Sequence, residues 1–287
     1  ALKSQGIKFF MLDGSAAISS VRPLIVQDKN LSIVSSATIP SYTDGSPLTC
    51  RLALTSQKYG PAIADYIAGR FPKVRVAFLI ANNDFSKSIE ETTSDNIKDV
   101  GGTVVGSESF DQAASDFRTQ ITKLKSLENE TDILVVSNAA NTVESMFKQL
   151  RDLKYGKPIV SENWTALNPQ LKNTALIEGI VFADYSFVSK PDSADRSKTA
   201  EFKQKYFQAY NQYPSPHAAN GYDAINVLIA GITKASEQTP IAVSKAIIED
   251  IREYSGVSGD LRFNSDCEVD RPVSMRVIKT GVPELLK

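Results

Sequence analysis

The chain has 287 residues, of which 42% are hydrophobic, so it can fill the cores of two domains. It carries 32 basic and 33 acidic residues, and the formal net charge of −1 gives no sign of the excess positive charge typical of nucleic-acid-binding proteins, so we expect no nucleic-acid partner. No apolar run approaches the ~20 residues that span a bilayer. No signal peptide precedes Ala1, but mature secreted proteins have lost their signal peptides, so this observation does not determine the compartment.

Short apolar strands alternate with amphipathic helices along the first two thirds of the chain. We expect strands at 7–12, 31–36, 76–81, 103–106, 132–136, 158–161 and 179–183. Between them we expect helices at 18–29, from Pro61 to Phe71, from Asp84 to Gly101, after Asp116 and after a cap at Asn141. This alternation predicts a parallel sheet covered by helices on both faces, with function in the turns that follow the strands.

The pattern changes in the last third. Residues 189–192 read as an extended linker, and three helices are expected at 194–210, 217–236 and 240–254. Residues 258–263 and 272–278 then alternate with period two, which predicts a hairpin or two neighbouring antiparallel strands.

Catalytic motifs are lacking. The sequence has neither a Gly-rich phosphate loop nor a nucleophile elbow, and His217 is its only histidine. The carboxylate pairs Glu90-Glu91 and Glu249-Asp250 are most simply solvated helix faces. We therefore expect no enzyme, no metal site and no cofactor.

Two cysteines occur, Cys50 and Cys267, too far apart in sequence for a local metal knuckle. They are either two buried thiols that behave as small apolar side chains or a disulfide.

Several local motifs, in order along the chain, resemble those of the type I periplasmic solute-binding proteins of ABC transporters, the branched-chain amino-acid-binding family. The matching segments are 33–38 (IVSSAT), 116–125 (DFRTQITKLK), 147–151 (FKQLR), 221–224 (GYDA), and 256–264 (GVSGDLRFN) followed by 270–273 (DRPV). The match is spread over the whole chain rather than concentrated in one motif.

The resemblance implies an α/β fold of two doubly wound lobes of largely parallel sheet, joined by a three-strand hinge. One lobe would comprise 1–58 and 191–268 and the other 59–190 and 269–287, with crossings near 56–59, 188–191 and 267–271. Family members normally begin with two further βα units, so the first lobe is expected to be incomplete. The same threading places Cys50 and Cys267 near neighbouring hinge strands, which implies a disulfide between them and an oxidising compartment.

The resemblance also implies a ligand site in the cleft between the lobes. In relatives that bind amino acids, hydroxyls and backbone N–H groups hold the ligand's carboxylate, and the equivalents here are Ser15 or, by stricter alignment, Ala16, together with the loop Ser36, Ala37 and Thr38. The alternative is that these hydroxyls only cap helices.

On the other lobe, the family's ammonium clamp falls on Ala139 and Asn163, flanked by Asn138, Glu162 and Trp164. This altered clamp implies either that Glu162 or Asp184 substitutes or that the ligand has no ammonium. Trp164 is a ligand platform or a core residue. Phe85 and His217 match cleft aromatics of the family, although a surface position for His217 stays open.

Three functions are compatible with these features. The leading one is an extracytoplasmic or periplasmic, Venus-flytrap-like solute-binding protein that delivers an amino acid or an aromatic or aliphatic acid to a membrane ABC permease. The second is a ligand-sensing regulatory domain of the same fold. The third, a nucleotide-using α/β enzyme, is disfavoured by the missing phosphate loop.

Overall fold

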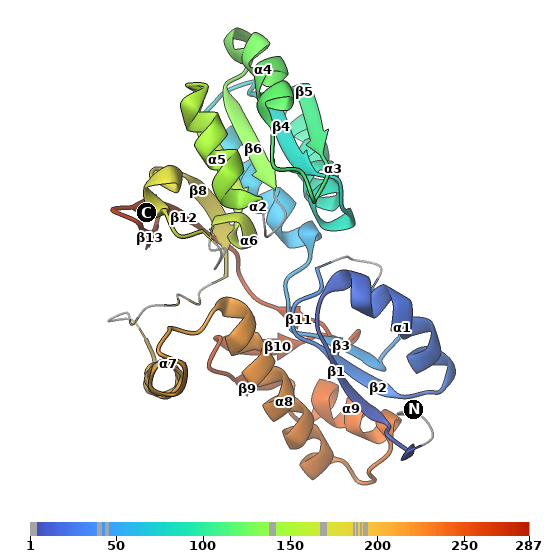
Figure 1. The fold of residues 1–287 in the computed structure, drawn as a ribbon. Coiled ribbons are helices and arrows are strands. Elements are labelled where there is room, and N and C mark those ends of the chain that lie inside the picture. Colours follow the sequence, from blue (N-terminus) through green and yellow to red (C-terminus); the bar gives the residue numbers. More distant parts are fainter. Residues whose placement is uncertain are drawn as a thin grey trace. The chain divides into compact units, whose positions relative to one another are not determined.

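The computed structural model describes residues 5–38, 42–43, 46–137, 142–166, 171–185, 187, 189, 191 and 195–286. The chain forms two compact units (Figure 1). Unit 1 consists of Ala1–Thr55 and Ser186–Pro272, and unit 2 of Ser56–Tyr185 and Val273–Lys287.

Unit 1 is built on a parallel sheet of order β1-β2-β3. Its strands are β1 (Phe9–Leu12), β2 (Leu31–Val34) and β3 (Thr49–Arg51). Alternate residues of β2 face opposite sides. Val34 packs on Ile18 of α1 (Ser15–Gln27), whereas Leu31 and Ile33 pack on α8 (Pro216–Lys234) and α9 (Pro240–Glu249). Helices therefore cover both faces of the sheet, as the alternating pattern predicts.

A second, antiparallel sheet of unit 1 has the order β11-β10-β9. Its strands are β9 (Glu253–Ser255), β10 (Asp260–Phe263) and β11 (Val269–Asp270), and helix α7 (Ser197–Tyr210) precedes α8 in the chain. Two expectations were wrong here. Helix α9 ends at Glu249, so Tyr254 belongs to β9, and the segment 258–263 does not pair with 272–278. Period-two alternation identifies a strand but carries no information about its partner.

Cys50 of β3 and Cys267 form a disulfide with Cα atoms 4.5 Å apart. The chain is held at the same place by a hydrogen bond of 2.8 Å from the Arg51 N–H to the Cys267 carbonyl and by an ion pair between Arg51 and Glu268. Strand β3 was not expected from the sequence. It is only three residues long, and it is fixed by β2 on one side and by Glu268 on the other.

Unit 2 contains a sheet of order β13-β12-β8-β7-β6-β4-β5 (Figure 1). Its strands are β4 (Arg75–Ala81), β5 (Thr103–Phe110), β6 (Ile133–Ser137), β7 (Ile159–Glu162), β8 (Val181–Asp184), β12 (Ser274–Lys279) and β13 (Val282–Leu285). Neighbours from β5 to β8 are parallel, while β12 pairs antiparallel with both β8 and β13. The strand expected at 272–278 thus extends the sheet of unit 2.

Helices lie on both faces of this sheet (Figure 1). They are α2 (Ser56–Ala68), α3 (Asp84–Asp99), α4 (Arg118–Ser126), α5 (Val143–Asp152) and the short α6 (Asn163–Ala166), with single 3₁₀ turns η3 (Glu128–Glu130) and η4 (Thr174–Ile177). Ala77, Leu79 and Ala81 of β4 join the core formed by α4 and α5. The intervening β4 residues face the side of α2 and α3, so the central strand is buried on both faces.

Two helix starts in unit 2 differ from expectation. Helix α2 begins at Ser56, and Pro61 lies inside it rather than at its first position. Gly60 lets α2 approach α3 closely, since a Cβ there would lie 2.2 Å from Oγ1 of Thr92. This packing offsets the backbone hydrogen bond that Pro61 cannot make. Thr142 occupies the N-cap position of α5, and the expected cap Asn141 lies outside the described residues.

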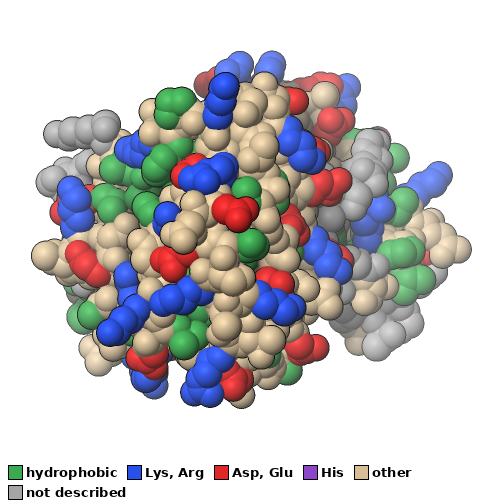
Figure 2. All heavy atoms as spheres, turned by 90° about the horizontal axis from the view of Figure 1, so that it is seen from above, with side chains coloured by type: hydrophobic (Ala, Val, Ile, Leu, Met, Phe, Trp, Pro, Cys, Tyr) green, Lys and Arg blue, Asp and Glu red, His purple; other side chains and the backbone are tan. Residues whose placement is uncertain are grey.

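On the face shown in Figure 2, basic and acidic side chains are interspersed, in keeping with the net charge of −1. Among the helices described, none combines the length and the apolar character needed to cross a membrane. The described His, Cys, Asp and Glu residues include no group of three or more placed to hold a metal ion.

Candidate ligand-binding residues at the strand ends

The carboxyl ends of β1 and β2 lie side by side, because the strands are parallel with Leu12 opposite Val34. Residues 35–38, here called the serine loop, follow β2, and Asp13 follows β1. The Ser35 hydroxyl donates to Oδ1 of Asp13 at 2.9 Å, and the Ser36 hydroxyl donates to the same oxygen. The two strand ends are therefore joined by a carboxylate.

The expected site residues of unit 1 differ in what they can offer a ligand. Ser36 and Thr38 are half-buried, whereas the Ala37 side chain is fully buried against Ile18, so Ala37 can offer only its backbone. Ser15 and Ala16 open helix α1, directly after the Gly14 N-cap, and their side chains lie outside the described part of the structure.

His217 comes from a distant part of the sequence to this same unit. It follows Pro216 at the start of α8, where the Ser215 side chain caps the helix by accepting the Ala218 N–H at 3.1 Å. Burial lowers the pKa of His217, and the nearby negative charge of Asp13 opposes this by raising it. The neutral imidazole is thus favoured, and it lies within electrostatic reach of the strand-end carboxylate.

One turn further along α8, the Asn220 side chain is buried. Its Nδ2 donates to the Ser35 carbonyl at 3.2 Å, which ties the helix to the serine loop. Sequence reasoning missed both Asn220 and Asp13. The position of Asp13 directly after a strand is a signal that could have identified it.

In unit 2, Glu162 is the last residue of β7 and is fully buried. Its carboxylate accepts hydrogen bonds from neutral donors, namely the Thr165 N–H at 3.2 Å, the Thr165 hydroxyl and the Ser137 hydroxyl at 3.4 Å. Ser137 ends the neighbouring strand β6, and its hydroxyl oxygen also lies 3.0 Å from that of Ser86 in α3. Hydroxyls of α6 and β6 thus contact one buried acid, and a hydroxyl of α3 contacts one of them.

Asp184, the last residue of β8, is a second fully buried acid. It accepts a hydrogen bond of 3.0 Å from Asn163 Nδ2, and its Oδ2 lies 3.7 Å from Nε of the buried Arg276. Asp184 therefore has a cationic partner inside the protein, and Asn163 orients it.

The remaining expected residues of unit 2 are placed as follows. Phe85 is half-buried at the start of α3, whose N-cap Asn83 accepts the Ser86 N–H at 2.8 Å. Trp164 lies in α6, but its side chain is outside the described part, and Asn138 and Ala139 fall outside the described residues altogether.

The family model for periplasmic binding proteins matches residues 2–281. The chain belongs to this family. Members of this family are solute-binding proteins, and the two units with their parallel sheets are those of type I periplasmic binding proteins.

Solved structures share the fold at low sequence identity. A leucine-binding protein of Thermotoga maritima is 19% identical, with a TM-score of 0.87 over 100% of this chain and 81% of its own. A branched-chain amino-acid-binding protein of Streptococcus pneumoniae, in complex with isoleucine, is 21% identical, with a TM-score of 0.83 over 100% of this chain and 81% of its own. A solute-binding protein of R. palustris, in complex with benzoate, is 15% identical, with a TM-score of 0.85 over 99% of this chain and 78% of its own.

Proposed function

We propose that this protein is an extracytoplasmic solute-binding protein that delivers a small carboxylate-bearing molecule to a membrane ABC permease, without changing the molecule chemically. The family match over residues 2–281 is the observation that carries the proposal. The Cys50–Cys267 disulfide supports the location, because disulfides persist in oxidising compartments.

The names of the similar structures support the ligand class. One is a leucine-binding protein, and two others are in complex with isoleucine and with benzoate. These compounds share a carboxylate but differ in whether they carry an ammonium. In this chain, the serine loop carries the half-buried Ser36 and Thr38 side chains and the backbone N–H groups of residues 36–38. Several neutral donors of this kind can hold a carboxylate.

Whether the ligand is an amino acid depends on an acid that can meet its ammonium. Both candidate acids are fully buried at strand ends, Glu162 at the end of β7 and Asp184 at the end of β8. A desolvated ammonium needs a carboxylate or several carbonyl acceptors. We propose Glu162 as the acid that selects for an amino group, because it directly precedes Asn163, the position that matches the family's ammonium clamp.

A thermal-shift screen tests the ligand class. A ligand that binds only the native state raises the melting temperature by mass action, so leucine, isoleucine, benzoate, ATP and NAD are compared at saturating concentration. We expect at least one of the carboxylates to raise the melting temperature and both nucleotides to leave it unchanged. A shift with ATP or NAD and none with any carboxylate would refute the proposal.

A matched pair of ligands tests Glu162. Leucine and 4-methylpentanoate share the carboxylate and the aliphatic chain, and only leucine carries the ammonium. If the natural ligand is an amino acid, Glu162→Gln should weaken leucine binding and leave 4-methylpentanoate binding unchanged. Equal loss for both compounds would assign Glu162 to the structure of unit 2 alone.

A further inference from the structure

A buried polar path in unit 1 runs from the serine loop to the segments by which the chain leaves the unit. These exit segments are residues 52–55, before the boundary at Thr55, and residues 268–272, before the boundary at Pro272. Two side chains form the path, Asn220 of α8 and Arg271.

Asn220 uses both ends of its amide. Nδ2 donates to the Ser35 carbonyl at 3.2 Å, and Oδ1 accepts from Nη2 of Arg271 at 3.4 Å. The residue is 1% exposed, so water cannot readily replace either contact. The amide therefore fixes the backbone of the serine loop relative to Arg271.

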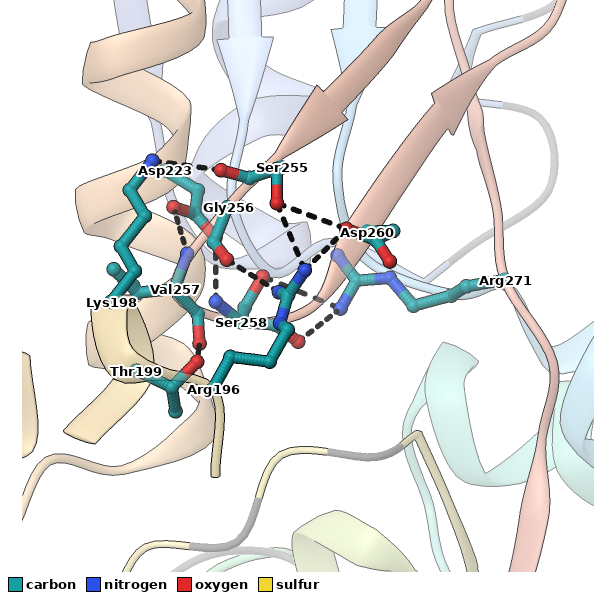
Figure 3. A network of polar contacts seen from close by, with 10 residues as sticks. All are labelled: Arg196, Lys198, Thr199, Asp223, Ser255, Gly256, Val257, Ser258, Asp260 and Arg271. Atoms are coloured by element: carbon teal, nitrogen blue, oxygen red, sulfur yellow. Dashed lines mark hydrogen bonds and ion pairs between the residues drawn. The ribbon is translucent and has the colours of Figure 1, made fainter. Parts of the chain in front are cut away.

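Arg271 links the two exit segments. It belongs to the second of them, and its Nη2 also donates to the Leu52 carbonyl of the first at 3.1 Å. Its Nη1 lies 3.4 Å from the Ser258 carbonyl (Figure 3). A planar guanidinium presents its donors in fixed directions, so these acceptors are held in one arrangement.

The Ser258 end of the path is itself rigid. Asp223 of α8 accepts the N–H groups of Val257 and Ser258, each at 2.8 Å, and Thr199 donates to the Val257 carbonyl at 3.0 Å (Figure 3). Arg271 thus contacts a turn that cannot move without breaking several hydrogen bonds.

We propose that Asn220 and Arg271 are positioning residues that hold the serine loop in its ligand-binding conformation and couple it to both exit segments. The inference rests on the proposed function, because it assigns ligand binding to the serine loop. Neither side chain needs to touch the ligand. A displacement of either exit segment moves the guanidinium, and Asn220 transmits that movement to the Ser35 carbonyl.

The test exploits two asparagines of the same helix. Asn220→Asp keeps the acceptor that faces Arg271 and replaces the donor that faces Ser35 with an oxygen. Asn226→Asp is the matched control, since Asn226 Nδ2 donates at 2.7 Å to the Tyr222 carbonyl on the exposed side of α8. Affinity for leucine and benzoate is measured by calorimetry, and amide exchange at residues 35–38 is followed without ligand.

We expect Asn220→Asp to weaken binding by about tenfold, in line with one lost buried hydrogen bond, and to accelerate exchange at residues 35–38. Asn226→Asp should change neither quantity. Arg271→Lys keeps the charge but loses the planar fork, and its effect should be non-additive with that of Asn220→Asp, because the two side chains form one path.

Wild-type affinity and exchange in Asn220→Asp, or additive effects in the double variant, would overturn the inference. If Asn220→Asp gives no folded protein, the smaller and uncharged Asn220→Ser repeats the test. If neither leucine nor benzoate binds the wild type, affinity is measured with the carboxylate that raises its melting temperature in the thermal-shift screen, and the exchange measurement still decides whether Asn220 orders the serine loop.

Discussion

If the serine loop binds the ligand as proposed, Asp13 determines which of its donors are available. Both the Ser35 and Ser36 hydroxyls donate to its carboxylate, so a ligand carboxylate at Ser36 would compete with Asp13 for the same proton. Asp13 is exposed, and water screens its repulsion of an incoming anion. Thr38 and the backbone N–H groups are therefore the better candidates to hold a ligand carboxylate.

Thr38→Val tests this hydroxyl. The substitution keeps the branched shape and removes the donor, so it should cost about 1–3 kcal/mol of binding free energy if the hydroxyl meets the ligand. Calorimetric titration with the carboxylate that stabilises the wild type measures the loss. Thr49→Val, in the fully buried strand β3 of the same sheet, is the control and should bind normally. Unchanged affinity in Thr38→Val would assign Thr38 a structural role only.

His217 should make stability depend on pH. Burial lowers its pKa below the ordinary value of 6.5, so between the two pKa values the unfolded chain binds a proton that the folded protein does not. The stabilisation from neutral His217 is therefore complete above pH 6.5 and is lost as the pH falls through 6.5 towards the folded pKa. We expect wild-type stability to fall more than that of His217→Gln between pH 7 and pH 5, measured by urea unfolding. Parallel curves for the two proteins would contradict this.

At the residue scale, sequence reasoning and structure differ for a physical reason. Motif resemblance predicts the serine loop as a ligand-binding segment, and its two hydroxyl-bearing candidates, Ser36 and Thr38, are half-buried. The contacts of Asn220 and Arg271 could not be predicted, because they join residues 185 and 219 positions apart in the chain. Such contacts depend on the fold rather than on local pattern.

At the scale of elements, two of the sequence motifs form one packed unit. The carboxylate of Asp223, in the segment GYDA, holds the turn of the segment GVSGD, and Gly256 lies directly against it. A Cβ on Gly256 would lie 2.3 Å from Oδ2 of Asp223. The glycine is therefore required by the close approach of helix α8.

Gly256→Ala should destabilise the protein by about 1–3 kcal/mol, because the buried Asp223 cannot move away without releasing two backbone N–H groups. Gly221→Ala is the control within α8. Its Cβ would lie an ordinary 3.4 Å from Met11, and alanine favours a helix, so stability should stay the same or rise. Urea unfolding measures the free energy of unfolding of both variants. Equal stability of Gly256→Ala and wild type would show that the turn can move to accommodate the added Cβ.

The elements themselves were largely predictable, whereas their partners were not. Periodicity located strands such as β4 and β6 and the buried face of α3, where Ile89, Thr93 and Ile97 are fully buried. Periodicity failed to locate the start of α2, because Pro61 indicates the first residue of a helix that in fact begins at Ser56 and packs closely at Gly60. It also failed to predict that β12 pairs with β8, because strand pairing depends on tertiary structure.

At the scale of the whole molecule, the two units have separate hydrophobic cores. Phe147 of α5 is fully buried in the core of unit 2, and Phe263 of β10 is 1% exposed in the core of unit 1. Compact units with their own cores open separately in native-state exchange.

Phe147→Ala should therefore cost about 3–5 kcal/mol and accelerate amide exchange in unit 2, while unit 1 keeps its protection. Phe263→Ala is the reciprocal control and should accelerate exchange in unit 1 alone. Hydrogen exchange measured by mass spectrometry reports the exchange rate of individual peptides, which can each be assigned to unit 1 or unit 2. Equal acceleration of both units by either variant would show that they unfold together.

The disulfide between Cys50 and Cys267, 217 positions apart, closes the backbone into a covalent ring that contains all of 56–185 and leaves only 273–287 of unit 2 outside. A single peptide cut between residues 51 and 266 opens this ring without dividing the molecule. We expect a singly nicked protein to run at full mass on a non-reducing gel and to separate into two fragments after reduction. Separation without reductant would contradict the ring. A molecule cut once in any of the intervening turns thus remains one covalent molecule.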